Sequence, residues 1–479
     1  MEIQDIIIAG DIPATIKNLK QKAVEVPSWE YLEKEYDQTA HPIVSDKSLR
    51  PDDKIGANGK KELAAKVTYP AEKIAVRRMA QMALSIPVKR VYDTNVDGKE
   101  DALKKEQAKS IEAVYKEVRI DGENVNRMKA YFAACEMMTV WYAIDTRVTH
   151  TKYGFPTTFK LRCRSYSPMP EKWSRITQAD LYPLFDEYGD MLAMSFEYEY
   201  IKGEDKVIYF ETYTADKHYK WALDGKEWTE EVNESVVIGK IPAVYLRRPL
   251  PIWEGISNNR NEIEFTLSRQ SDIIRKNSAP IILLAGETVG EKPIGDKARE
   301  VYQLEKGGSL DLKSPAITHE SSKFYIDALK QNIDEDLQLP NLSLANIKDL
   351  GDIGEGARKT LLTDAHLKVG DESHEINRFL QREEGLIKSL VSRLHTPYTS
   401  TINNLGVEHI ITPFIQNDEL AEIEKMEKAT GGKAILSRRT AIAMTNLVKD
   451  PDAEIALIRE EEQQAAELMR MGDVFESGV

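Results

Sequence analysis

The sequence predicts a mixed α+β protein of several domains, and three observations lead to this fold class. Its 479 residues are about three times an average domain, which allows roughly two to four domains. Its hydrophobic residues change spacing along the chain, from helical to alternating and back to helical. Its 41% hydrophobic and 30% charged residues are typical of globular proteins with real cores.

Net charge limits the possible functions. The chain has 65 Lys and Arg against 79 Asp and Glu, a net charge of −14 and a pI near 5.3. A protein that coats nucleic acid needs net positive charge to neutralise phosphates, so that class is disfavoured, although local basic rings are compatible with the balance.

Membrane insertion and secretion are also disfavoured. Apolar runs such as Pro280–Ala285 fall far short of the about 20 residues of a membrane-spanning helix. The acidic start, Met1–Asp5, is unlike a secretory signal. Two cysteines, Cys135 and Cys163, form no CxxC pattern, so we expect buried thiols in a reducing cytosol, with a disulfide or metal role as the alternative.

Residues 1–150 are expected to be mainly helical, with a loop-rich insert at Thr39–Val67. The clearest helix is predicted at about Glu123–Ile144. Its apolar residues recur every three or four positions, as on the core-facing side of a helix: Val125, Met128, Phe132, Cys135, Met138 and Tyr142.

Residues 155–250 alternate apolar and polar side chains, as in Phe159–Arg164 and Met194–Tyr200. Turn signals separate these runs at Tyr188–Asp190, Lys202–Asp205 and Asp224–Gly225. This pattern predicts an antiparallel meander. Its many aromatic residues suit cross-strand packing, and base stacking is the alternative.

Two slender helices are predicted around a small module. The first begins near Ser257, a good capping residue, and the second near Ser322. Each has a narrow apolar seam: Ile256, Ile263, Leu267 and Ile274 in the first, and Ile326, Leu329, Ile333 and Leu337 in the second. Between them, a short apolar strand at Ile281–Leu284 opens a glycine-rich segment.

A polar, glycine-bearing loop at Leu339–Gly356 leads into a very long helix, predicted at Ala357–His395. Its apolar residues repeat at helical spacing, Gly370 and Gly385 are the expected kink points, and Pro397 ends it. The last 65 residues are predicted to be helical and to finish in an acidic arm.

Motifs for catalysis are incomplete. The run Ala285–Lys292 resembles a phosphate loop, but its spacing is wrong and Pro293 replaces the magnesium-binding hydroxyl. A zinc protease motif begins at His374–Glu375 but has Arg378 where the second histidine belongs. The run Asp334–Asp336 is interpreted as a solvated or channel-facing acidic band, with a magnesium or acid/base cluster as the alternative. We therefore expect no catalysis, no metal and no cofactor.

Two segments carry a family resemblance. One is Gly239–Tyr245, followed by Pro249 and the helix at 257–278. The other comprises Ile435–Ala441, Val448–Glu454 and Ile458 with Glu460–Glu462. Together with the order of the predicted elements, these segments resemble the portal proteins of tailed double-stranded DNA bacteriophages.

The resemblance implies a portal fold of wing, stem, clip and crown that assembles into a ring, a dodecamer in this family. The implied division is as follows: 1–256 wing, with a helical N-terminal part and the β-meander at 155–250; 257–278 first stem helix; 279–321 clip; 322–338 second stem helix; 339–356 tunnel loop; 357–395 long kinked wing helix; 396–434 wing–crown transition; and 435–479 crown helices.

The implied function is a channel at one capsid vertex for packaging and ejection of double-stranded DNA. The implied location is the virion, after synthesis in the host cytoplasm. The implied partners are sister copies, the DNA, the terminase large subunit, the major capsid and scaffolding proteins and the head–tail adaptor, with no membrane.

A channel through which DNA slides should hold few phosphates, so sparse cations suit it. Candidate tunnel residues are Arg260, Arg269, Lys276, Asn341, Asn346, Lys348, Asp349 and Asp352, and Arg275 also lies on the first stem helix. For the stem cations, pairing with Glu262, Glu264 and Asp272 or with a neighbouring subunit is the alternative. Candidate docking residues in the clip are Glu287, Glu291, Lys292, Asp296 and Lys297.

A narrow helix pair cannot bury both of its faces alone, and identical neighbours can cover them. The predicted helix pair is therefore compatible with a ring of copies. Two other functions stay open from the sequence. One is a metal-dependent DNA-acting enzyme with carboxylates from distant segments. The other is a collar or scaffold protein that forms rings but passes no DNA.

Overall fold

The computed structural model describes residues 6–476, except for residues 9, 22–24, 51–53, 56–60, 97–98, 204, 278–280, 286–308, 314–318, 340–361, 415–418, 432–434, 446–447 and 449–450. Contacts within the chain divide it into two compact units. The first comprises Met1–Asn341 and Asp364–Phe414, and the second comprises Leu342–Thr363 and Ile415–Val479.

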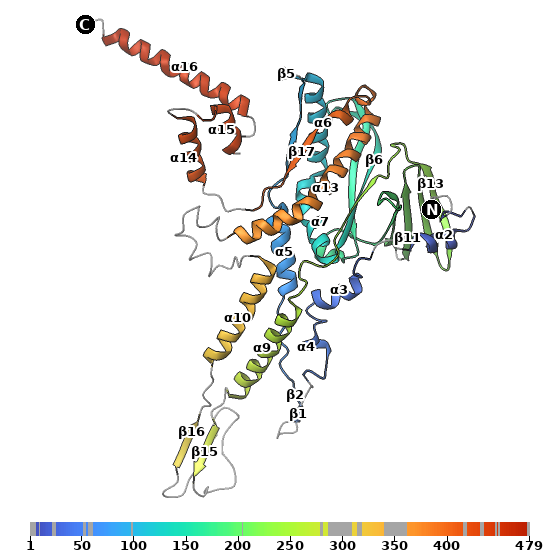
Figure 1. Ribbon diagram of the computed structural model, residues 1–479, viewed down its shortest axis with the longest axis vertical. Coiled ribbons are helices and arrows are strands. Elements are labelled where there is room, and N and C mark those ends of the chain that lie inside the picture. The colour runs from blue at the N-terminus through green and yellow to red at the C-terminus, as the bar shows by residue number, and fades with distance from the viewer. Residues whose placement is uncertain are drawn as a thin grey trace. The chain divides into compact units, whose positions relative to one another are not determined.

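The N-terminal part of the first unit is mainly helical, as predicted (Figure 1). Its helices are α2 (Ile12–Leu19), α3 (Trp29–Tyr36), α4 (Pro42–Ser45), α5 (Ala71–Leu84), α6 (Ala102–Val118) and α7 (Ile120–Ala134). Short strands accompany them: β1 (Lys54–Ile55) pairs with β2 (Lys61–Glu62), β4 (Asn95–Val96) with β5 (Lys99–Glu100), and β3 (Lys89–Tyr92) with the distant β17 (Val407–Ile410).

The helix predicted at Glu123–Ile144 is wrong in its second half. Helix α7 ends at Ala134, Cys135 adopts a left-handed backbone conformation with φ of 63°, and strand β6 (Glu136–His150) follows. The first six residues of β6 are all buried. A strand that is covered on both faces does not alternate apolar and polar side chains. The apolar run of β6 therefore continued the helical spacing of α7 by chance.

Two antiparallel sheets follow, and the predicted meander forms the larger one. It has the order β13-β12-β11-β10-β9, in which each strand pairs with its neighbour in sequence. The smaller sheet has the order β14-β6-β7-β8, in which only β7 and β8 run parallel. The bounds are β7 (Thr157–Ser167), β8 (Thr177–Gln178), β9 (Asp180–Phe185), β10 (Met191–Lys202), β11 (Asp205–Thr214), β12 (Lys217–Asp224), β13 (Glu227–Ser235) and β14 (Ala243–Arg247).

Aromatic side chains of the meander are packing residues, as expected. Phe196 and Tyr198 of β10 pack with Tyr166 of β7 between the two sheets. On the other side of the meander, Phe210 and Trp221 pack against helix α2. Each ring therefore has neighbours within the fold, and a nucleic-acid base is not needed to explain it.

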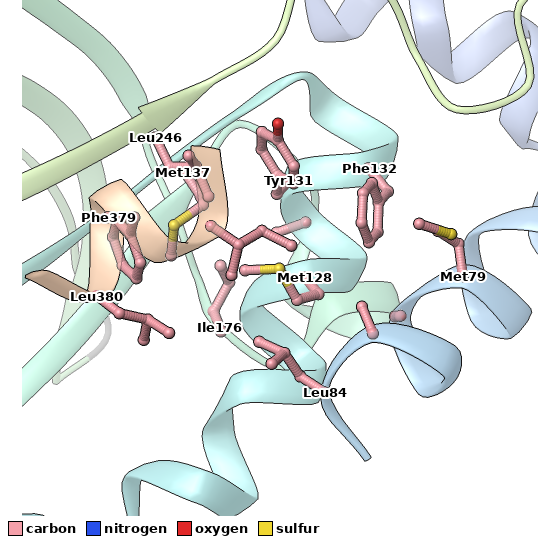
Figure 2. Close-up of a cluster of buried hydrophobic side chains, with 14 of the residues drawn as sticks. Met79, Leu84, Met128, Tyr131, Phe132, Met137, Ile176, Leu246, Phe379 and Leu380 are labelled. Atoms are coloured by element: carbon pink, nitrogen blue, oxygen red, sulfur yellow. The ribbon is translucent and has the colours of Figure 1, made fainter. Parts of the chain in front are cut away.

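The main core lies around α5, α7 and the long helix α13 (Thr363–Leu394). Figure 2 shows Met128, Tyr131 and Phe132 of α7 together with Met79 and Leu84 of α5 and with Phe379 and Leu380 of α13. Six of the eight apolar positions predicted for the long helix are buried, namely Ala365, Val369, Ile376, Leu380, Ile387 and Val391, and the other two, Leu362 and Leu394, are half-buried. The carbonyl groups of Gly370 and Gly385 accept hydrogen bonds from the hydroxyl groups of Ser373 and Ser389, a contact that often bends helices, and the kinks at these glycines stay a prediction.

The two slender helices are present as α9 (Ser257–Asn277) and α10 (His319–Leu337), and they pack on each other (Figure 1). The predicted strand after the first helix is β15 (Ile281–Ala285), which pairs with β16 (Ser309–Lys313). Two 3-10 turns, Thr396–Tyr398 and Ile402–Asn404, follow α13. The second unit contains α14 (Glu419–Thr430), α15 (Arg438–Thr445) and α16 (Pro451–Glu476), so its predicted helical character is confirmed.

Candidate functional site

Helices α9 and α10 form the candidate site, because the predicted channel residues with described side chains lie on α9. Ile263 of α9 and Ile326, Leu329 and Ile333 of α10 are buried. Ile274, which the seam pattern placed in this interface, is 50% exposed instead. The apolar seam is therefore well buried where α9 begins and α10 ends, and poorly buried at the end of α9 next to β15.

A segment of the N-terminal part runs along α9, and we call the described residues within 35–72 the strap. Helix α4, which belongs to the strap, contacts α9 directly (Figure 1). Backbone N–H groups of the strap donate to α9 side chains in a ladder: Tyr69 to Glu264 Oε1 at 2.7 Å, Val67 to Ser268 Oγ at 2.9 Å and Ala65 to Asp272 Oδ1 at 2.9 Å.

The regular spacing of this ladder has a geometric origin. Alternate residues of an extended segment point the same way and advance about 6.6 Å, while four residues of a helix advance about 6 Å and return to the same face. Donors two residues apart therefore match acceptors four residues apart. This contact was not predicted, because Glu264 and Asp272 were interpreted only as alternative ion-pair partners for the cations of the same helix.

Buried polar contacts hold the strap at the start of α9. The Glu35 carboxylate accepts hydrogen bonds from Trp253 Nε1 and from the hydroxyl group of Ser257, each at 2.9 Å. His41 is fully buried, with Nδ1 at 2.6 Å from Glu264 Oε1 and Nε2 at 2.8 Å from the carbonyl oxygen of Glu35. A buried polar group needs such partners, so this end of the strap is fixed more firmly than an ordinary surface loop.

Arg260 does not fit the tunnel role predicted for it. Its side chain is buried, and its Nε lies 3.2 Å from Oε1 of Glu72, the last residue of the strap. Burial raises the pKa of Glu72 to about 7, although the charge of Arg260 works in the opposite direction. A buried arginine that faces a carboxylate of its own chain cannot line an open channel.

Asp272, one of the partners predicted for the α9 cations, pairs with the strap instead. Arg50 forms an ion pair with Asp272 and also donates to the Ala65 carbonyl group at 3.2 Å. Desolvation acts to raise the pKa of Asp272, but the Ala65 N–H group and Arg50 outweigh it and hold this pKa below its ordinary value. The partner of Arg260 likewise comes from the strap and not from α9 itself.

Two other predicted cations stay on the surface of α9. Arg269 is exposed, and its guanidinium group lies 5.6 Å from the centre of the Phe265 ring. Arg275 is exposed and donates to the Leu63 carbonyl group at 3.2 Å. The Lys276 side chain lies outside the described residues, as do all of the following predicted residues: Asn341, Asn346, Lys348, Asp349, Asp352, Glu287, Glu291, Lys292, Asp296 and Lys297.

The acidic run at the end of α10 serves partly as an anchor. Arg78 of α5 donates to Asp334 at 3.2 Å, and burial raises the pKa of Asp334. Glu335 and Asp336 are exposed, as expected of an acidic band. Lys368 of α13 donates to the Leu337 carbonyl group at 2.6 Å, which satisfies the end of α10. Among the described residues no group of three or more His, Cys, Asp or Glu could hold a metal ion.

A buried ion pair that the sequence did not predict fixes α13 against the sheet. Arg127 of α7 and Glu383 of α13 form a fully buried salt bridge, and Trp141 Nε1 of β6 donates to Glu383 at 2.9 Å. Thr139 accepts from the same arginine at 2.7 Å. Because these four residues come from three elements, the network sets the position of the long helix beside β6 and α7.

Both cysteines are free thiols, as predicted, with Cys135 buried and Cys163 half-buried. Burial raises the pKa of each to about 12, so neither is an activated nucleophile.

Exposed apolar side chains lie on the half of the helix pair nearest to β15 and β16. Ile273 and Ile274 of α9 are 44% and 50% exposed, and Phe324 and Tyr325 of α10 are 77% and 44% exposed. We call these four residues the distal patch. Large apolar side chains that stay exposed on a slender helix pair are typical of a protein–protein contact.

Comparison with known proteins assigns the family. No helix of the described residues is long and apolar enough to cross a membrane. A search of curated proteins found no significant match to the sequence. The family described as "Phage portal protein, SPP1 Gp6-like" matches residues 18–468, which include both sheets, the strap and the helix pair. On this match, the chain belongs to the phage portal protein family.

Proposed function

We propose that copies of this chain form a closed ring, a dodecamer as the resemblance implies, whose central channel passes double-stranded DNA during packaging and ejection. Family membership makes the chain a bacteriophage portal protein of the capsid vertex that serves genome packaging. The observation that supports ring formation is the distal patch, whose apolar side chains stay 44–77% exposed within the described part of the chain. Sister copies in a closed ring would provide this cover.

The channel function agrees with the charge on α9. Arg269 is exposed there, Arg260 is buried, and the whole chain carries a net charge of −14. A wall with few cations retains few phosphates, so the duplex can slide. The tunnel loop at 339–356, with Asn341, Asn346, Lys348, Asp349 and Asp352, is proposed to contact the duplex most closely.

Docking is proposed to use the clip at 279–321. Its charged residues Glu287, Glu291, Lys292, Asp296 and Lys297 would contact first the terminase large subunit and later the head–tail adaptor. The major capsid and scaffolding proteins would surround the ring. Portal proteins are structural proteins, and ATP hydrolysis would belong to the terminase.

Native mass spectrometry of the purified chain tests the ring. We expect one large assembly of fixed copy number for the wild type, and smaller species for Phe324→Glu, because a charge in the distal patch opposes burial. Tyr188→Glu is the matched control, since Tyr188 is 84% exposed in the turn between β9 and β10. A uniform monomer of the wild type at every concentration and salt would contradict the proposal.

Packaging assays separate the portal from the two alternatives. Capsids with an altered tunnel loop should assemble and yet package less DNA, whereas a collar protein that passes no DNA would tolerate the change. Metal-dependent turnover of DNA by the purified chain, abolished by one carboxylate substitution, would instead support an enzyme.

A further inference from the structure

Five cations from three helices gather beside α3, and we call them the cationic cluster. Lys73 and Arg77 lie one turn apart on α5, Lys129 lies on α7, and Lys172 and Arg175 lie on and just after α8 (Glu171–Ser174). Helix α7 packs on both α5 and α8, which brings the five side chains to one region of the first unit. None of these residues is among the predicted channel or clip positions.

Aromatic rings fix part of the cluster. The Trp173 ring has two ammonium groups near it, Lys172 Nζ at 4.1 Å and Lys73 Nζ at 5.4 Å from its centre. Lys73 Nζ also lies 5.5 Å from the centre of the Tyr36 ring. Trp173 itself packs against Trp29 and Tyr36, with centroid distances of 5.7 and 5.3 Å. Because the rings are held by the core, the two lysines are partly ordered before any ligand arrives.

Negative charge is scarce around these cations. Asp37 lies 3.8 Å from Lys73 and also interacts electrostatically with Lys172, and within the described part of the chain no other carboxylate lies within ion-pair distance of the five cations. Among the described residues, Glu171 at the start of α8 forms no ion pair with these cations, and Glu72 pairs with Arg260 instead. Most other cations that anchor this region, such as Arg78, have a carboxylate partner.

Mutual repulsion follows from this arrangement. Burial lowers the pKa of Lys129, and the positive charges of Arg175 and Arg77 lower it further. Like charges held together raise the free energy of the unliganded protein. An anion that bridges them would remove this repulsion and gain charge-assisted hydrogen bonds.

We propose that the cationic cluster binds the phosphodiester backbone of double-stranded DNA, at a site apart from the predicted channel residues. Two arginines suit phosphates because a guanidinium group can donate two parallel hydrogen bonds to one phosphate. No base-reading geometry is needed, so the binding is independent of sequence. An acidic protein segment is the competing ligand, and DNA is favoured because the portal family implies passage of DNA.

Fluorescence anisotropy on the full-length chain with a labelled 20-base-pair duplex tests the site. The variant Arg77→Gln/Lys129→Gln/Arg175→Gln removes three positive charges from the cluster. The control Lys104→Gln/Lys109→Gln/Lys116→Gln removes three from α6, so the net charge is the same in both. Affinity is measured between 50 and 200 mM salt.

We expect the cluster variant to bind about tenfold or more weakly at the lowest salt, and its log–log salt slope to be smaller by about 2.7, since each lost phosphate contact removes about 0.9. The α6 control should keep the wild-type slope. Native mass spectrometry of the same samples reports ring formation separately, so a failed ring proposal is distinguishable from a failed DNA site.

Two results would overturn the inference. One is a cluster variant with the affinity and slope of the wild type while its circular dichroism spectrum is unchanged. The other is that an unlabelled poly-glutamate peptide of equal charge binds the cationic cluster of the wild type while the duplex does not bind there. That result would identify an acidic protein as the ligand.

Discussion

Replacing Ser268 by alanine should loosen the strap while it strengthens the helix beneath. Ser268 is fully buried, and its Oγ accepts the Val67 N–H group at 2.9 Å. Loss of one such hydrogen bond is worth about 1 kcal/mol, which is about a fivefold change in the opening equilibrium of the strap. Alanine is a better helix former than serine by about 0.5 kcal/mol, so α9 itself should become more protected.

Hydrogen–deuterium exchange read by mass spectrometry can follow both effects in one experiment. Peptides that cover residues 63–69 should exchange about five times faster in Ser268→Ala, while peptides from α9 should exchange no faster. Thr266→Ala is the control, because Thr266 lies on the same helix and makes no described contact with the strap. Unchanged exchange at 63–69, or an equal increase in the control, would refute the ladder as the contact that holds the strap.

Three further predictions concern buried charges and thiols. Arg127→Met should lower the free energy of unfolding by about 3–5 kcal/mol in urea titrations, because Glu383 is left buried without its partner. The double variant Arg127→Met/Glu383→Leu should recover most of this loss. A double variant as unstable as the single one would contradict this prediction. The pKa of Glu72 is 4.5 in the unfolded state and is raised to about 7 in the folded state, so between these pH values only the folded state keeps the proton. The free energy of unfolding therefore falls as pH rises from 4.5 to about 7. Urea titrations at pH 5 and pH 8 should show the free-energy difference between Glu72→Gln and wild type move by about 2.5 kcal/mol in favour of the variant at pH 8, and no movement would show that this carboxyl group titrates normally. Cys135 and Cys163 should react with a thiol reagent at pH 8 far more slowly in the native protein than in denaturant, and rapid reaction of both in the native protein would refute their burial.

Elements with a one-sided apolar pattern could be predicted from the sequence. The meander, α9, α10 and α13 each bury one face. The spacing of their apolar residues therefore indicates both the type of element and the face that packs on the core. β6 could not be predicted, because its first residues are buried on both faces and its apolar run joined that of α7. The left-handed turn at Cys135, which separates the two elements, leaves no sequence signal in a residue other than glycine.

The candidate site was predicted less well, for an electrostatic reason. Whether a cation on α9 faces a channel or a partner depends on which distant segment packs beside it, and Arg260 meets Glu72 across a sequence separation of almost 190 residues. Such a contact has no local pattern. The strap was expected to be a loop-rich insert, and its backbone indeed lacks regular pairing from Leu63 to Pro70. Its hydrogen bonds go to side chains of α9, which no periodicity of its own could indicate.

The strap changes the physical argument for the ring. The sequence pattern predicts that sister copies cover the helix pair. In the structure, the strap supplies polar cover along α9 from Ser257 to Asp272. The need for a neighbour is therefore concentrated in the distal patch, whose four apolar side chains the ladder leaves exposed. Because Glu72 lies in the first turn of α5 and pairs with Arg260, a rotation of α9 about its own axis would break this ion pair and the one between Arg50 and Asp272. Contacts of the distal patch with a sister copy would thus be transmitted through α9 to α5 and to the main core as one mechanical connection.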